Sequence, residues 1–179
     1  MRTLRYALLL TFLASVMASL AAAQNIVSDD DHRFTVAVPI GWRVIKLPDH
    51  MKLTMGDSVI HIMYIPGQPS AAKVGEAALG ASGESYVNAV ETEKGVATLG
   101  GDDGVFVNFQ AYDERSVDTL VHVVATKSGW CFFAATSDAA YSSLRVQFDK
   151  IEKSFALTKN IPQATPAPEP QKTDSTPHN

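Results

Sequence analysis

Cysteine is almost absent from this 179-residue chain, and clusters of basic residues are missing altogether. The one cysteine, Cys131, excludes an internal disulfide framework and any zinc module built on several cysteines. The chain carries 15 basic and 19 acidic residues, which gives a net charge of −4. Nucleic-acid binding requires clustered lysine and arginine, so this composition argues against a nucleic-acid partner. With 46% apolar residues, the chain is long enough for one globular domain.

No apolar run has the length of a membrane span. Residues 6–20 form a predominantly apolar run, whose 15 residues fall short of the roughly 20 that a membrane-spanning helix needs. Arg2 and Arg5 precede this run, and three alanines at 21–23 follow it. Basic, apolar and small residues in that order are typical of a secretory signal peptide. We therefore expect residues 1–23 to be a signal peptide that is cleaved after Ala23.

Cleavage would leave a secreted or periplasmic protein without a stable membrane anchor. No cysteine lies near the cleavage point, which excludes the anchor of a bacterial lipoprotein. Residues 24–32 are predicted to be a flexible lead-in. Residues 159–179 combine several prolines with polar residues and have no aliphatic residue after Ile161 except alanine. Such a segment cannot bury enough apolar surface to fold, so it is predicted to be a disordered tail.

The first half of the domain is predicted to consist of strands. Runs over 34–38 and 42–47 flank a Pro-Ile-Gly turn, and Gly56-Asp57 favours a two-residue hairpin turn between 52–55 and 58–65. If Met55 pairs with Ser58, opposite residues sum to 113. One face of the hairpin is then buried, with Met51, Leu53, Ile60, Ile62 and Tyr64. The other is predicted to be solvated or partner-facing, with His50, Lys52, Thr54, His61 and Met63.

The remaining elements predict an α+β fold. Short helices are expected over 71–79 and 84–93, because glycines at 75, 80 and 83 interrupt a longer one. Four β-rich runs, 96–99, 105–112, 117–126 and 130–136, indicate an antiparallel meander. The closing helix carries apolar residues at steps of 3 and 4, namely Tyr141, Leu144, Phe148, Ile151 and Phe155. We expect a single domain over 33–158: a central antiparallel sheet flanked by helices, with the long C-terminal helix packed on it.

Two motifs resemble a known family. They are the aromatic turn Phe34-x-Val36-x-x-Pro39-x-Gly41-Trp42 and the helix end Phe148-x-x-Ile151-x-x-Ser154-Phe155. In order and spacing, the chain from 33 to 157 resembles the PsbP-like superfamily, which includes PsbP and exported DcrB-like proteins. The resemblance implies a sheet with helices on its faces and a protein that binds or assists larger assemblies without catalysis. It supplies no active-site residue to carry over.

Several short motifs invite a catalytic interpretation and fit a structural one better. Ser70 and Lys73 match the S-x-x-K of serine β-lactamases, but a chain of this size cannot hold the two-domain body of those enzymes. A helix N-cap followed by a surface lysine is the simpler interpretation. Ser82 lacks the second glycine of a nucleophile elbow, because Glu84 stands there. Cys131 has no neighbouring base in the sequence and is predicted to be a buried small hydrophobe.

The histidines give a second functional hypothesis. His50, His61 and Met63 share one face of the hairpin, and such residues are copper ligands, but Lys52 stands opposite His61 and would repel a cation. His122 is expected to be half-buried and hydrogen-bonded. The sequence therefore predicts an exported, non-catalytic accessory or binding module, with no catalytic, cofactor or metal residues. It is expected to be a monomer whose partner is an unidentified protein or envelope component.

The alternative is a small periplasmic metal-binding protein or hydrolase that uses His50, His61 and His122. It requires these side chains to converge within metal-bonding reach of a common point, about 2.0–2.2 Å for histidine nitrogen.

Overall fold

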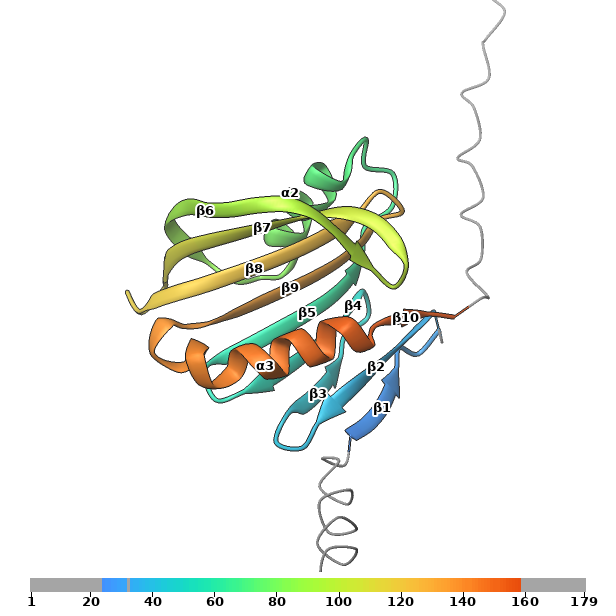
Figure 1. Ribbon diagram of the computed structural model, residues 1–179, viewed down its shortest axis with the longest axis horizontal. Coiled ribbons are helices and arrows are strands. Elements are labelled where there is room, and N and C mark those ends of the chain that lie inside the picture. The colour runs from blue at the N-terminus through green and yellow to red at the C-terminus, as the bar shows by residue number, and fades with distance from the viewer. Residues whose placement is uncertain (1–23, 32, 159–179) are drawn as a thin grey trace, which may run out of the picture.

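Two antiparallel sheets and two helices make up the part of the chain that the computed structural model describes, residues 24–31 and 33–158 (Figure 1). A three-stranded sheet has the order β1-β2-β10, and a seven-stranded sheet has the order β3-β4-β5-β9-β8-β7-β6. The bounds are β1 Gln24–Ser28, β2 Phe34–Pro39, β3 Arg43–Lys46, β4 His50–Met55, β5 Ser58–Tyr64, α2 Ala71–Ala81, β6 Tyr86–Leu99, β7 Asp102–Asp113, β8 Asp118–Thr126, β9 Trp130–Ser137, α3 Asp138–Ser154 and β10 Ala156–Leu157. This arrangement confirms the predicted α+β fold with a central antiparallel sheet.

The β4–β5 hairpin has the predicted register. Met55 pairs with Ser58 at the turn, and the pairing runs to His50 opposite Met63. Gly56 has φ +58°, a left-handed conformation that glycine adopts without steric cost. β5 then pairs with β9, so the hairpin lies next to the middle of the seven-stranded sheet.

Helix α3 covers one face of this sheet, as Figure 1 shows. Of its predicted apolar stripe, Leu144, Phe148 and Ile151 are buried within the helix, and Phe155 is buried directly after its end. Phe148 packs edge-on against Trp42, with ring centroids 5.7 Å apart, and the Trp42 Nε1 donates a hydrogen bond to the Gln147 side chain at 2.8 Å. The small sheet shares this core through β2, whose inward residues are Phe34, Val36 and Val38. The closing helix therefore joins the two sheets.

Helix α2 covers part of the opposite face, chiefly over β8 and β9, and this corrects for β5 the expectation of a solvated or partner-facing surface. Ser70 caps α2 as predicted, accepting a hydrogen bond from the Lys73 backbone, and Val74 and Ala78 are fully buried. Gly75 permits a close approach, because a Cβ at this position would lie 3.5 Å from Val123. On this face of the β4–β5 hairpin, the β5 residues are covered, with His61 0% and Met63 2% exposed, whereas Lys52 and Thr54 of β4 are half-buried.

The prediction of a second helix over 84–93 is wrong. This segment belongs to β6, which pairs antiparallel with β7 along a long hairpin and carries two bulges. β-Branched residues at 87, 90, 92, 96 and 98 favour a strand. The hydrogen-bond partners of this strand come from β7, and this pairing cannot be predicted from the local sequence of 84–93. Most of β6 is solvent-exposed because it forms an edge of the sheet, and this hides the apolar alternation that marks a buried strand.

The lead-in over 24–32 was expected to be flexible, but its first five residues form a strand. Gln24–Ser28 forms β1, paired along its whole length with β2. Asp29 is 7% exposed, and its carboxylate accepts hydrogen bonds from the backbone N–H and Nε of Arg33 at 2.6 and 2.7 Å. These bonds fix the turn into β2. The predicted signal peptide over 1–23 and the predicted tail over 159–179 lie outside the described residues.

Replacing Phe148 by alanine should lower the free energy of unfolding by about 3–5 kcal/mol, because the ring is 7% exposed and fills the contact between α3 and the sheet. Chemical denaturation measures this loss. Val146, on the same helix but 59% exposed, supplies the control: Val146→Ala should change stability by no more than about 0.5 kcal/mol. A loss below about 1 kcal/mol in Phe148→Ala would show that α3 is peripheral.

Candidate functional site

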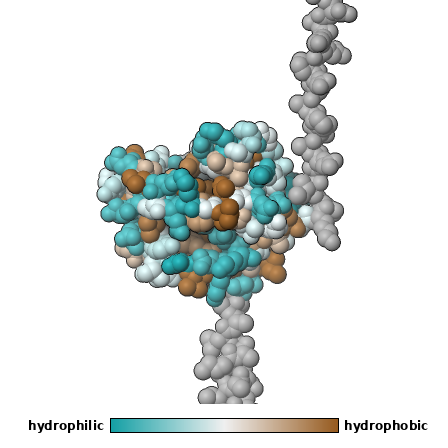
Figure 2. All heavy atoms as spheres, turned by 45° about the horizontal axis from the view of Figure 1, so that its top comes forward, coloured by the Kyte–Doolittle hydropathy of each residue, from teal (hydrophilic) through white to brown (hydrophobic). Residues whose placement is uncertain are grey.

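An apolar groove lies between α2 and the β6–β7 hairpin, with a volume of about 750 Å³. Its floor is aliphatic and comes from β7 and β8, with Val105, Val107, Val123 and Ala125. Small residues of α2, Ala71, Ala72 and Gly75, form one wall, and β6 forms the other. Figure 2 shows apolar side chains gathered in the middle of this face between hydrophilic neighbours. The groove is thus open to solvent while its interior offers few polar groups.

Charged residues stand only at the rim of this groove. Glu91 and Lys94 of β6 form an ion pair at 2.8 Å, and Glu76 of α2 pairs with Lys73. Both pairs join residues three apart in the sequence and are exposed, so they leave the floor uncharged. Val96 of β6 also lines the groove and is 89% exposed. An exposed aliphatic residue beside an aliphatic floor favours contact with an apolar ligand.

The groove continues along α2 into a smaller cavity of about 180 Å³. Leu79 and Phe109 line both spaces, and Tyr86, Ala111 and Val121 close the far end. Burial raises the pKa of the Tyr86 phenol, so this ring is neutral and contributes its apolar face. The two spaces together form one elongated apolar path on the α2 side of the sheet.

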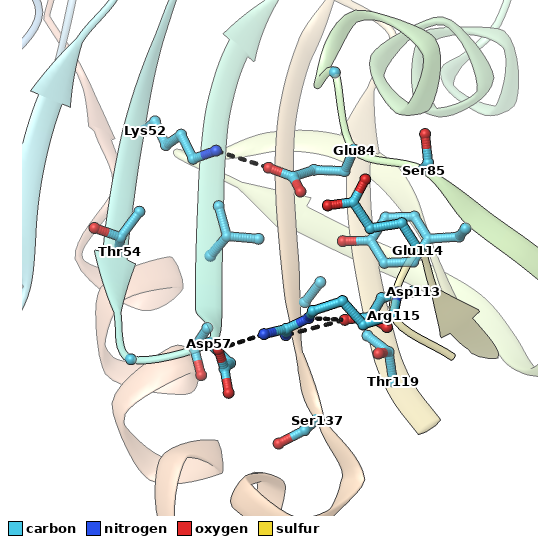
Figure 3. Close-up of a pocket in the computed structure, with 16 residues that line it drawn as sticks. Lys52, Thr54, Asp57, Glu84, Ser85, Asp113, Glu114, Arg115, Thr119 and Ser137 are labelled. Carbon is cyan, nitrogen blue, oxygen red and sulfur yellow. Dashed lines mark hydrogen bonds and ion pairs between the residues drawn. The ribbon is translucent and has the colours of Figure 1, made fainter. Parts of the chain in front are cut away.

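A polar pocket of about 340 Å³ lies beside the β4–β5 turn (Figure 3). Arg115 bridges two turns here: its guanidinium lies 3.1 Å from Asp57 and 3.0 Å from Asp113. The Asp113 carboxylate also accepts backbone hydrogen bonds from Arg115 and Val117, and these bonds lower its pKa. Because these charges are paired with one another, the arrangement holds the two turns together and presents no free nucleophile or base among the residues named.

His61 lies in a charged cluster on the α2 side of the hairpin. Its Nε2 is 3.1 Å from Glu84 Oε1, and the same oxygen accepts a hydrogen bond from Lys52 Nζ at 2.7 Å. Burial lowers the pKa of His61, so the neutral ring donates its Nε2–H to Glu84. The hydrogen bonds from His61 and Lys52 lower the pKa of Glu84 to about 2. Glu84 therefore satisfies two buried or half-buried groups of the hairpin.

His50 lies next to His61, with ring centroids 5.0 Å apart. Its Nδ1 lies 2.8 Å from the Asp49 carboxylate, and its side chain is 7% exposed. Both imidazoles are therefore covered, although they lie on the hairpin face that was predicted to be solvated or partner-facing.

His122 lies on the opposite face of the sheet. Its Nδ1 is 2.6 Å from Asn108 Oδ1, and its Nε2 is 3.1 Å from Glu152 of α3. The prediction of a half-buried, hydrogen-bonded histidine is confirmed, since the side chain is 32% exposed. His50, His61 and His122 do not converge, so a hydrolase or metal centre built from all three is contradicted. Within 24–31 and 33–158, no three His, Cys, Asp or Glu side chains are grouped to hold a metal ion.

The other short motifs have structural roles. Lys73 pairs with Glu76, one turn further along α2 and away from the Ser70 hydroxyl, which caps the helix. The Ser82 hydroxyl donates a hydrogen bond to the Leu79 carbonyl at the end of α2. Cys131 is 0% exposed, and burial raises the pKa of its thiol to about 12, which keeps it protonated. These findings match the structural interpretations derived from the sequence.

Sequence reasoning missed Glu84 and the groove. Glu84 was expected to begin a helix, and its partners lie 23 and 32 positions away in the sequence. The groove was missed because one wall is β6, which was predicted to be partly helical. The β-branched residues spaced along 87–98 are the signal that could have identified this strand.

Glu84 should titrate near pH 2, well below its usual value of 4.5, when its carboxyl signal is followed by NMR. Because the folded-state pKa is depressed, the carboxylate stabilises the fold above about pH 4.5, and this contribution is lost as the pH falls toward 2. Lys52→Met removes one of its hydrogen-bond donors and should raise the midpoint. A wild-type midpoint at or above 4.5, or one that Lys52→Met leaves unchanged, would contradict the cluster.

Comparison with known proteins places the fold. No family model and no curated protein matches the chain. The solution structure of cyanobacterial PsbP (CyanoP) from Synechocystis sp. PCC 6803 matches with a TM-score of 0.52 and 14% identity, over 76% of this chain and 94% of that one. LpqN of Mycobacterium tuberculosis, described as involved in cell envelope biogenesis, matches at 0.50 and 16%, over 81% and 96%. The Saccharomyces cerevisiae Ran-binding protein Mog1p matches at 0.50 and 8%, over 76% and 96%.

These matches confirm the PsbP-like resemblance at the level of the fold. Their identities of 8–16% are too low to transfer a ligand or a site residue. The chain from β1 to β10 has the PsbP-like fold.

Proposed function

We propose that this protein is an exported, non-catalytic binding module that holds an apolar chain of an envelope component in the groove between α2 and β6–β7. The groove itself carries the proposal. Its volume of about 750 Å³ lies within the range of small-molecule sites, and its floor is aliphatic. A hydrocarbon chain gains free energy from such a surface by leaving water and needs no polar partner there.

The charged groups described above support a binding role over a catalytic one. Lys52 and Glu84, Asp57 and Arg115, and Glu91 and Lys94 are each paired. General acid–base catalysis needs a titratable group within hydrogen-bond reach of the substrate. In the groove, the charged groups stand at the rim and neutralise one another.

Two observations favour an envelope component as the ligand: the predicted export of the protein and the description of one structural neighbour. LpqN, which has the same fold, is described as involved in cell envelope biogenesis. No helix of the described residues is long and apolar enough to cross a membrane. Cleavage after Ala23 would leave β1 whole, since that strand begins at Gln24. We therefore expect a secreted or periplasmic protein that meets its ligand outside the cytoplasm.

A fluorescent fatty acid should bind the purified protein with a stoichiometry of one. Val96→Glu puts a charge at the groove without disturbing the core, because Val96 is 89% exposed. We expect this change to weaken binding at least tenfold, which corresponds to about 1.4 kcal/mol. Fluorescence titration measures both dissociation constants.

The matched control is Val146→Glu, which introduces the same charge at an exposed valine of α3 on the other side of the sheet. It should leave the affinity unchanged. Equal weakening in the two variants would mean that net charge governs binding, and absence of binding to the wild-type protein would remove the groove as a site for apolar chains.

Export has a separate test. The intact mass of the protein recovered from the periplasm or medium should correspond to a chain that starts at Gln24, with or without cyclisation of this glutamine. A membrane-bound protein that keeps Met1 would contradict cleavage and, with it, the proposed location.

A further inference from the structure

Besides Trp130 Nε1, two buried ring nitrogens in the described residues have no hydrogen-bond partner, and these two belong to neighbouring histidines. They are His50 Nε2 and His61 Nδ1. The two ring centroids are 5.0 Å apart and the ring planes are tilted by 40°. The His61 side chain is 0% exposed and that of His50 is 7% exposed. Buried polar atoms are almost always satisfied, so two such nitrogens on neighbouring rings indicate a missing common partner.

The remaining nitrogen of each ring is held by a carboxylate. His50 Nδ1 lies 2.8 Å from Asp49 Oδ1, and His61 Nε2 lies 3.1 Å from Glu84 Oε1. A carboxylate accepts the N–H of a neutral imidazole, and the lone pair is then left on the other nitrogen. Histidines that bind metals are oriented in this way, by a carboxylate on the nitrogen that faces away from the metal. Both free nitrogens are therefore prepared as ligands.

Met63 supplies a third donor on the same face. It pairs directly with His50 across the β4–β5 hairpin and is 2% exposed. Side chains at directly opposite positions of an antiparallel pair have Cβ atoms about 4.5–5.5 Å apart, so a methionine side chain at this position is long enough to reach the His50 ring. Two imidazoles and a thioether form a soft, uncharged donor set.

The surrounding charges favour a monovalent ion. The charged side chains nearest to the two rings are Asp49, whose carboxylate is 71% exposed, and the ion pair of Glu84 with Lys52. Because Asp49 faces solvent and Lys52 already pairs with Glu84, the site has no buried excess of negative charge that would favour a divalent ion. The sequence suggested that Lys52 would repel a cation at this site. In the structure Lys52 instead contacts Glu84 on the Nε2 side of His61, across the ring from the free Nδ1.

We propose that His50 Nε2, His61 Nδ1 and the Met63 thioether form a binding site for a soft monovalent metal ion, Cu(I). Thioether and imidazole donors in a low-coordinate arrangement suit Cu(I) better than harder ions, which prefer carboxylate and water oxygens. The site is separate from the α2 groove, whose lining includes none of these three residues.

Metal titration of the purified protein under anaerobic conditions tests this site, with Cu(I) and the redox-inert Ag(I) as probes against a chromophoric chelator. The wild-type protein should retain one equivalent of either ion. His50→Gln should lower the affinity for Cu(I) at least tenfold, and Met63→Leu, a change of similar volume in the core, should lower it as well. His122→Gln is the matched control, because His122 lies on the other face with both nitrogens bonded, and it should bind like the wild type.

Folding is checked separately, because His61 is fully buried and His61→Gln alone could act through stability. Circular dichroism should show native spectra for His50→Gln and Met63→Leu, and Ag(I) should raise the melting temperature of the wild type but not of His50→Gln. X-ray absorption spectroscopy at the copper edge should detect nitrogen and sulfur atoms bound to the metal. No retained copper, equal affinity in His50→Gln and the wild type, or tighter binding of Zn²⁺ than of Cu(I) would overturn the proposal.

Discussion

Burial of β5 and β9 on both faces is the constraint on which the rest of the structure depends. Six of the seven residues of β5 and seven of the eight of β9 are buried, so these two strands need cover above and below. A strand with one wet face would alternate apolar and polar residues, and the sequence of β9 is instead almost continuously apolar or small. Helix α3 and strand β2 cover one face, and α2 covers the other. The order of the remaining strands follows from pairing outward on either side of β5 and β9.

Local signals in the sequence predicted the β4–β5 hairpin and α3, because each is specified by neighbouring residues. Gly56-Asp57 fixed the register of the hairpin, and the steps of 3 and 4 from Leu144 to Ile151 marked α3. The environment of His61 could not be predicted in this way. Its alternation with Ile60 and Ile62 indicated a wet face, but Glu84 and α2, which follow later in the chain, close that face. The prediction for the edge strand β6 failed for the opposite reason. Most of this strand is exposed, so its sequence lacks the apolar alternation that marks a half-buried strand.

Glu84 links the polar cluster to the groove. It lies between α2 and β6, and its carboxylate is held by Lys52 of β4 and His61 of β5. The same residue lines the cavity that continues the groove along α2. The ion pair therefore fixes the start of β6, which forms one wall of the apolar site. A charge placed in a half-buried position is unfavourable unless it is paired, and the bonds from Lys52 and His61 offset this cost for Glu84 just before the edge strand β6.

The size of α2 explains why both proposed sites lie on the same side of the sheet. An α-helix with its side chains is about 10 Å wide, and strands are spaced about 4.8 Å apart, so one helix covers roughly two strands. On the α3 side the small sheet adds to the cover, but on the other side α2 packs alone, chiefly on β8 and β9. Beyond α2, one flank holds β6 and the outer part of β7, where the groove opens, and the other holds β4, where His50 lies beside the buried His61. With a single short helix on this face, the PsbP-like fold leaves two separate places, the groove and the histidine site. At both of them the side chains determine which ligand binds.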